Sequence, residues 1–174
     1  MPTNPTQEPT RHVLSVLVED VDAIMSRVSG LFTRRGYSME SITSAVTNDP
    51  RFNRITIVVT ATEAVVEQIT KQLNKLINVI KVVRLDQDNS IARALMLVKI
   101  STNATTRNQV VDAANLFRAR VIDVSQDSVV IESTGGLDKL EALLDVLRPF
   151  GVMEMIQCGQ IALNRGTKTL TFNG

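Results

Sequence analysis

Residues 68–86 read QITKQLNKLINVIKVVRLD and join an amphipathic helix to a strand with almost no loop between them. Ile69, Leu73 and Leu76 recur at helical spacing, and polar residues fill the positions around them. Residues 79–84 are then rich in Val and Ile, which favours a β-strand. No catalytic residue type is concentrated here, so the stretch predicts a structural scaffold.

The residues before this stretch complete a six-element unit. The pattern predicts, in order, a strand at 12–18, a helix at 22–36, strands at 37–47 and 54–61, a helix at 63–76 and a strand at 78–85. The order β-α-β-β-α-β is that of the ferredoxin-like fold, in which two helices cover one face of a four-stranded antiparallel sheet.

The same order recurs in the second half of the chain. The second set comprises a strand at 94–100, a helix at 106–119, strands at 120–124 and 128–133, a helix after Gly136 and a strand at 152–163. We therefore expect an α+β protein made of two tandem ferredoxin-like domains. The expected boundaries are a flexible tail at 1–10, domains at 11–86 and 94–165, a linker at 87–93 and a loose tail at 166–174.

Composition narrows the function classes. The 174 residues are 44% hydrophobic and 21% charged, which suits folded domains rather than a disordered chain. A net charge of +1 gives no field to attract nucleic acid or an anionic membrane, and no apolar run approaches the roughly 20 residues that span a bilayer. With one cysteine there is no intrachain disulfide, and a polar start lacks signal-peptide features, so we expect a cytoplasmic protein.

The sequence carries no constellation typical of an enzyme. It has no Gly-rich phosphate loop, no Gly-x-Ser-x-Gly and no zinc-ligand spacing. His12 and Cys158 are the only residues of their kinds, and we expect structural roles for both. The central strands also lack the aromatic residues with which RNA-recognition modules stack bases, which argues against RNA binding.

The turn into the first helix is the strongest candidate for a binding site. A helix N-terminus presents unpaired N–H groups that suit a carboxylate, and Asp20 beside it could meet an ammonium group, so a free α-amino acid fits. Asp20 or Asp22 could instead cap this helix, and both interpretations stay open. Arg34 and Arg35 at its other end match the helix dipole. The helix-free face of the first sheet, which carries Val58, predicts pairing with a second copy in a homodimer.

Several runs of sequence resemble the regulatory (small) subunit of acetohydroxyacid synthase (acetolactate synthase) of the actinobacterial type. The runs are RHVLSVLVED at 11–20, SRVSGLFTRRGY at 26–37, Glu40-Ser41, residues 68–86, LVKI at 97–100, NLFRA at 115–119, VIDV at 121–124 and KLEAL at 139–143. The resemblance covers about residues 11–166, and it implies that the first domain is an ACT domain.

The resemblance also implies a function. Small subunits of this family are not enzymes. They activate a large subunit that carries thiamine diphosphate, Mg²⁺ and FAD, and they mediate feedback inhibition by valine or other branched-chain amino acids. The family holds its effector between two ACT domains, which implies that Asp20, Asp22, Ala23 and Ile24 of one chain face Ser38 and Met39 of the other.

Two positions depart from the family pattern in a way that bears on the effector. Ala23 stands where the family usually has Gly, so we expect its methyl group to crowd the ligand and to disfavour a positive-φ backbone. Ser38 stands where Asn is common and is shorter. We therefore expect weakened valine affinity. The alternative function is a stand-alone ACT-type amino-acid sensor that acts on another protein, and a DNA-binding segment that would favour it is absent from the sequence.

Overall fold

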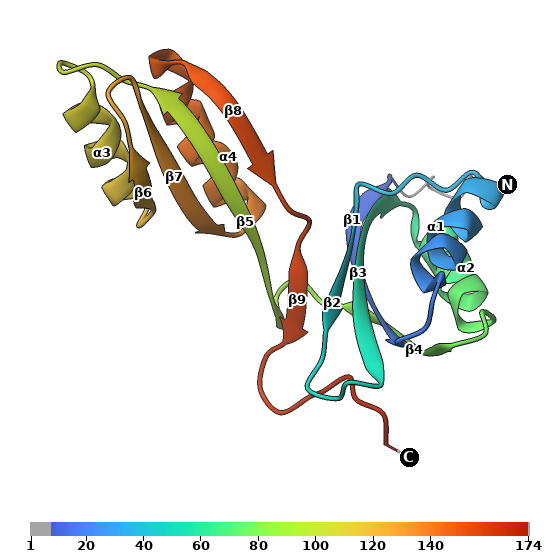
Figure 1. Cartoon of the computed structure of the whole chain (residues 1–174). Coiled ribbons are helices and arrows are strands. Elements are labelled where there is room, and N and C mark those ends of the chain that lie inside the picture. Colours follow the sequence, from blue (N-terminus) through green and yellow to red (C-terminus); the bar gives the residue numbers. More distant parts are fainter. Residues whose placement is uncertain (1–7, 174) are drawn as a thin grey trace, which may run out of the picture. The chain divides into compact units, whose positions relative to one another are not determined.

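A computed structural model describes residues 8–173. Within these residues the chain divides into two compact units, the first made of residues 8–91 and 161–173 and the second of residues 92–160. Each unit contains an antiparallel sheet with two helices on one face (Figure 1). The expected α+β fold with two tandem ferredoxin-like domains is confirmed.

The first unit follows the predicted order of elements. They are β1 (Thr10–Glu19), α1 (Ile24–Arg35), β2 (Ser41–Val46), β3 (Phe52–Ala61), α2 (Glu63–Asn74) and β4 (Val79–Leu85). The sheet order is β2-β3-β1-β4, so β2 and β4 are its edges. Alternation along the strands puts Ile55 and Ile57 under the helices, where they pack with Val28 and Ile69 in one hydrophobic core.

The second unit repeats this arrangement. Its elements are β5 (Ser90–Ser101), α3 (Arg107–Leu116), β6 (Arg120–Val124), β7 (Ser128–Gly135), α4 (Leu137–Leu147), a 3₁₀ turn (Arg148–Phe150) and β8 (Val152–Gln157). The sheet order is β6-β7-β5-β8. Its core joins Met96 and Val98 of β5 to Leu140 and Leu143 of α4.

Several element boundaries differ from the prediction. The strand expected at 37–47 begins only at Ser41, because Gly36 in the left-handed region lets the Tyr37 N–H bond back to the Phe32 carbonyl and end α1. The linker expected at 87–93 ends early, since Ser90 already belongs to β5. Both helices of the first unit are shorter than predicted. α1 lies between Ala23 and Gly36, which are both in the left-handed region, and α2 ends at Asn74 although the apolar spacing continues to Leu76.

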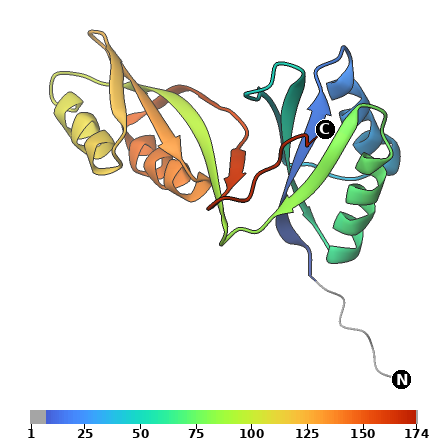
Figure 2. The same ribbon diagram turned by 90° about the horizontal axis from the view of Figure 1, so that it is seen from below.

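The C-terminal residues depart most from the prediction. The strand expected at 152–163 breaks after Gln157 and resumes as β9 (Ile161–Asn164), which pairs with β5. Residues 161–173 belong to the first unit rather than to a second domain and a loose tail. Leu170 is 6% exposed because it packs on Leu17 and Phe52, and Phe172 lies against Phe52 with ring centroids 5.1 Å apart. The C-terminal end of the chain runs beside the first sheet (Figure 2).

This packing changes the expectation for the helix-free face of the first sheet. Val58, Ser15 and Thr56 point to that face and are buried, and the C-terminal residues cover part of it. Val58 is therefore not exposed on that face, contrary to the prediction, whereas the pairing with a second copy stays a prediction.

Candidate functional site

The turn between β1 and α1 is held by a backbone hydrogen bond to Arg51, the residue that precedes β3. The Asp20 N–H donates to the Arg51 carbonyl at 2.8 Å, and the Val21 N–H donates to the Glu19 carbonyl at 3.0 Å. The chain then enters α1 through Ala23, which has φ 63° and ψ 11° and offers no side-chain cap. The expectation that Ala23 disfavours positive φ is corrected: this alanine occupies the left-handed region, where an L-residue is strained.

The start of α1 leaves backbone donors open. Among the described residues, the N–H groups of Asp22, Ala23 and Met25 have no hydrogen-bond acceptor, and the Ile24 N–H reaches only the Val21 carbonyl at 3.4 Å. Capping by Asp20 or Asp22 was one of the two interpretations, and it is wrong because Ala23 is the N-cap. Unpaired amides at a helix N-terminus attract anions, so this turn suits a carboxylate.

Asp20 places a negative charge beside these amides. Its side chain is exposed, and its Oδ1 accepts a hydrogen bond of 2.6 Å from Asn53 Nδ2 on β3. Arg51 does not neutralise it, because Arg51 binds Asp49 through Nε and Nη2, with 2.7 Å between Nη2 and Asp49 Oδ2. The hydrogen bonds and charge of Arg51 lower the pKa of Asp49 from 3.8 to about 2.

A polar network behind the turn fixes the start of α1. Asn78 accepts a 2.7 Å hydrogen bond from Arg27 Nη1 on α1 and donates from Nδ2 to the Glu19 carboxylate. The Asn78 carbonyl also accepts from the Glu19 N–H at 2.9 Å. Asn78 has φ 74°, a conformation that asparagine tolerates better than most residues. The network therefore joins the end of β1, the start of α1 and the residue before β4.

The six predicted site residues do not all lie together in one chain. Asp20, Asp22, Ala23 and Ile24 form the β1–α1 turn, where the Ile24 side chain is buried in the core and only its backbone faces outward. Ser38 and Met39 precede β2. Since Ser41 pairs with Val58 and Val46 pairs with Asn53, they lie beyond the opposite end of this strand. Six residues of strand span about 17 Å, so one chain does not bring the two groups into one site.

Ser38 and Met39 have different surroundings. Ser38 is exposed and lines a shallow pocket of about 400 Å³ together with Arg35, Tyr37 and Val65. Met39 is half-buried and packs against the core of the first unit. Ser38 thus offers its side chain to the outside, whereas Met39 mainly anchors the start of β2.

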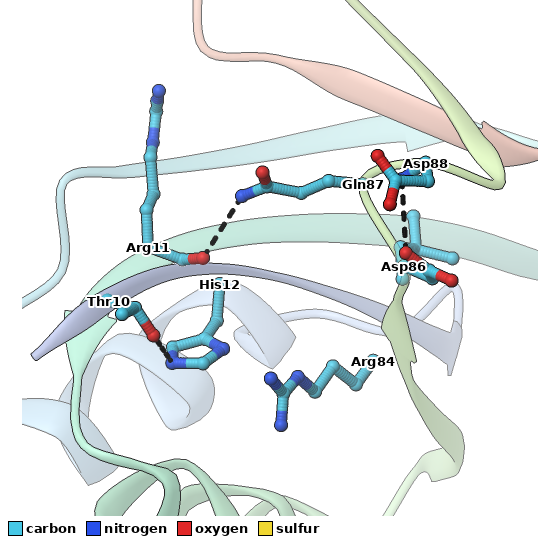
Figure 3. A pocket seen from close by; sticks show the side chains of 8 residues that line it. Thr10, Arg11, His12, Arg84, Asp86, Gln87 and Asp88 are labelled. Carbon is cyan, nitrogen blue, oxygen red and sulfur yellow. Dashed lines mark hydrogen bonds between the residues drawn. The ribbon is translucent and has the colours of Figure 1, made fainter. Parts of the chain in front are cut away.

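A second pocket lies at the other end of β1, where the chain leaves β4. It has a volume of about 520 Å³, and three of its charged side chains, Arg11, Arg84 and Asp86, bind other residues of the chain. Figure 3 shows His12 beside Thr10 and Gln87 beside the Arg11 backbone. His12 Nε2 lies 3.0 Å from both Thr10 Oγ1 and the Ala61 carbonyl, which fits a structural role, and Arg84 pairs with Glu63.

The remaining candidate residues carry no catalytic arrangement. Cys158 follows β8 and is exposed, and its Sγ accepts a hydrogen bond from the Leu95 N–H at 3.2 Å. Residues 8–173 contain no group of three or more His, Cys, Asp or Glu side chains placed to hold a metal ion. No helix in the described part of the chain is long and apolar enough to cross a membrane.

Comparisons with known proteins agree with this arrangement. Residues 14–81 match the ACT domain of the acetohydroxyacid synthase small subunit, and residues 93–166 match the model described as the small subunit of acetolactate synthase. The chain is 52% identical to the acetolactate synthase small subunit of Mycolicibacterium smegmatis over 157 residues, which are 90% of this chain and 92% of that protein. It is 54% identical to that of Mycobacterium leprae, over 90% of this chain and 93% of that protein.

A solved structure supports the same assignment. The acetolactate synthase small subunit of Thermotoga maritima matches with a TM-score of 0.86 and 33% identity, over 91% of this chain and 99% of that chain. The matches thus extend over both ferredoxin-like units. This chain belongs to the acetolactate synthase small-subunit family.

Proposed function

We propose that this chain activates a catalytic acetolactate synthase subunit and makes it sensitive to valine or another branched-chain amino acid. The β1–α1 turn carries the proposal. Its open amides at Asp22, Ala23 and Met25 suit the carboxylate of an amino acid, and the exposed Asp20 suits the ammonium group. A zwitterion needs both charges matched within one small site, and this turn offers both.

The shape of the first sheet suggests how the second half of the site arises. β2 is an edge strand, so its outer backbone groups are available to another strand. If two copies pair antiparallel through β2, the start of β2 in one chain lies beside the end of β2 in the other. Val46 at that end neighbours Asn53, which binds Asp20. A homodimer through the ACT domain would therefore bring Ser38 and Met39 to the partner's turn.

Feedback then follows from linkage. An amino acid that binds across the pair favours the arrangement of small subunits in which its site is complete. Inhibition requires that this arrangement support the catalytic subunit less well. In this proposal the catalytic partner carries thiamine diphosphate, Mg²⁺ and FAD, and this chain supplies no cofactor and no reacting group. Both subunits would act in the cytoplasm.

The valine response is expected to be weaker than in a small subunit with Gly at position 23. Ala23 already has the positive φ of the turn, so its effect comes from the exposed methyl group beside the open amides and from strain. Ser38 is shorter than Asn and would reach less far toward the effector.

Reconstitution tests this function. The purified full chain is mixed with the catalytic subunit, and acetolactate formation is measured with and without valine, leucine and isoleucine. The proposal expects higher turnover with this chain and a partial loss of that gain with valine. If amino acids bind but turnover does not rise, the stand-alone sensor is the better description. Full inhibition at the low valine concentrations typical of Gly-containing relatives would contradict the weakening.

A further inference from the structure

A third pocket, of about 350 Å³, lies on the helix-free face of the first sheet. Its walls come from the β2–β3 turn, including Val46 and Asn48, and from the C-terminal segment, including Leu163, Lys168 and Leu170. All of these residues belong to the first unit. The pocket falls within the size range of small-molecule sites.

Arg54 lines this pocket and lacks a counter-ion. It alternates with Ile55 along β3, so its side chain points to the helix-free face. Its Nε donates to Ser15 Oγ at 2.5 Å, whereas its Nη2 is buried without a hydrogen-bond acceptor among the described residues. Desolvation lowers the pKa of this guanidinium. A half-buried cation with a buried, unpaired N–H group is costly unless an anion compensates it, so the Nη2 of Arg54 suits an anionic ligand.

The other lining residues favour an anion with an apolar part. Within residues 8–173 no Asp or Glu lines the pocket, and Lys168 adds a second positive charge. Val46, Leu163 and Leu170 contribute aliphatic surface. The Ser15 hydroxyl already accepts a hydrogen bond from the Nε of Arg54, so its buried Nη2 remains for a ligand. A single donor group suits one carboxylate oxygen rather than a multiply charged phosphate.

We infer that this pocket binds a small aliphatic carboxylate, with its charged end on Arg54 and Lys168 and its chain against Val46, Leu163 and Leu170. The C-terminal segment is part of the site, because Leu170 anchors it on Leu17 and Phe52. The pocket is separate from the β1–α1 turn and needs neither an ammonium group nor a second copy of the chain.

Titration of the isotopically labelled full chain with isobutyrate tests the site, with backbone amide shifts followed by NMR at saturating valine. The amides of Thr47, Asn48 and Thr169 should shift in a saturable way, and those of Asp22 and Met25 should not. Neutral isobutyramide, which has the same shape without the charge, should cause no such shifts. Shifts confined to the β1–α1 turn, or equal shifts with the amide, would overturn the inference.

Two variants assign the charges. Arg54→Met should weaken isobutyrate binding at least tenfold, because a charge-assisted hydrogen bond is lost. Lys168→Gln should weaken isobutyrate binding about threefold, because the lost charge is exposed. For the same reason this variant should fold like the parent chain. Lys75→Gln on the helix side is the matched control and should bind like the parent. If both single variants, Arg54→Met and Lys168→Gln, bind isobutyrate as tightly as the parent, the site is refuted. This outcome does not depend on whether valine regulates the enzyme.

Discussion

The two helices of the first unit begin in opposite ways. α2 starts after Thr62, whose Oγ1 accepts a hydrogen bond from the Val65 N–H, and Glu63 lies in its first turn. α1 starts after Ala23, which has φ 63°, provides no cap, and has no acidic residue in its first turn. Both helices cover the same face of the same sheet, so their two starts can be compared directly.

The comparison indicates that the start of α1 is locally less stable than the start of α2. A side-chain cap contributes about 1 kcal/mol, and the left-handed conformation costs an L-residue roughly 1–2 kcal/mol. α2 has the first advantage, whereas α1 lacks it and also carries the strain. Such local cost concentrates at sites where backbone must remain open to a ligand. The contrast therefore supports a binding role for the β1–α1 turn.

The largest expected effect comes from removing the charge at this turn. Asp20→Asn keeps an oxygen for the hydrogen bond from Asn53 but loses the negative charge that would meet an ammonium group. We expect the valine concentration for half-maximal inhibition to rise at least tenfold, since charge-assisted hydrogen bonds contribute roughly 1.5–3 kcal/mol. Inhibition curves of the reconstituted holoenzyme measure it. Glu63→Gln, at the start of α2, is the control and should leave the curve unchanged.

Exchange of alanine for glycine should have opposite effects at the two helix starts. Ala23→Gly relieves the strain at φ 63° and should stabilise the chain by about 1 kcal/mol while sharpening valine inhibition. Ala64→Gly, in the first turn of α2, should destabilise the chain by roughly 0.5–1 kcal/mol without altering the valine response. Urea unfolding of the two variants checks the signs. Equal signs would mean that Ala23 is not strained.

Loss of the cap on α2 should be milder. Thr62→Ala removes the acceptor for the Val65 N–H, but that bond is long at 3.4 Å, so the cost belongs at the lower end of the range, about 0.5 kcal/mol. Hydrogen exchange of the first-turn amides of α2 should rise, while exchange at the start of α1 should not. Faster exchange at both helices would show that the two starts are coupled.

The regular part of the first unit was predictable because period and burial agree. Ile55 and Ile57 alternate along a strand, Ile69 recurs at helical spacing, and all three lie in one hydrophobic core. The end of the chain was not predictable in the same way. Leu170 is one apolar residue in a polar segment, and its burial depends on Leu17 and Phe52, which are distant in sequence. No local pattern signals such a contact.

The candidate site likewise contains residues that local sequence predicts and residues that it does not. Asp20 and the open amides follow from a strand that runs into a helix, which is local information. Asn53 and Asn78 were missed, because each reaches the turn from another strand or its flank. Their only signal is that amide side chains favour turns and strand ends. The positive φ of Ala23 was expected to be disfavoured, and the fold imposes it.

The smallest expected effect is a pH dependence at the start of α2. Hydrogen bonding and charge from Arg84 lower the pKa of Glu63 below its ordinary value of 4.5. A carboxyl whose pKa is depressed by folding adds stability above its unfolded pKa, and this share is lost as the pH falls through the folded pKa. The excess of the parent's urea midpoint over that of Glu63→Gln should thus be complete at pH 6, begin to fall near pH 4.5 and be lost once the pH lies below the folded pKa of Glu63. Because both side chains are about half exposed, added salt should also reduce this difference in urea midpoint. A difference that persists in acid would exclude the Glu63–Arg84 ion pair as its source.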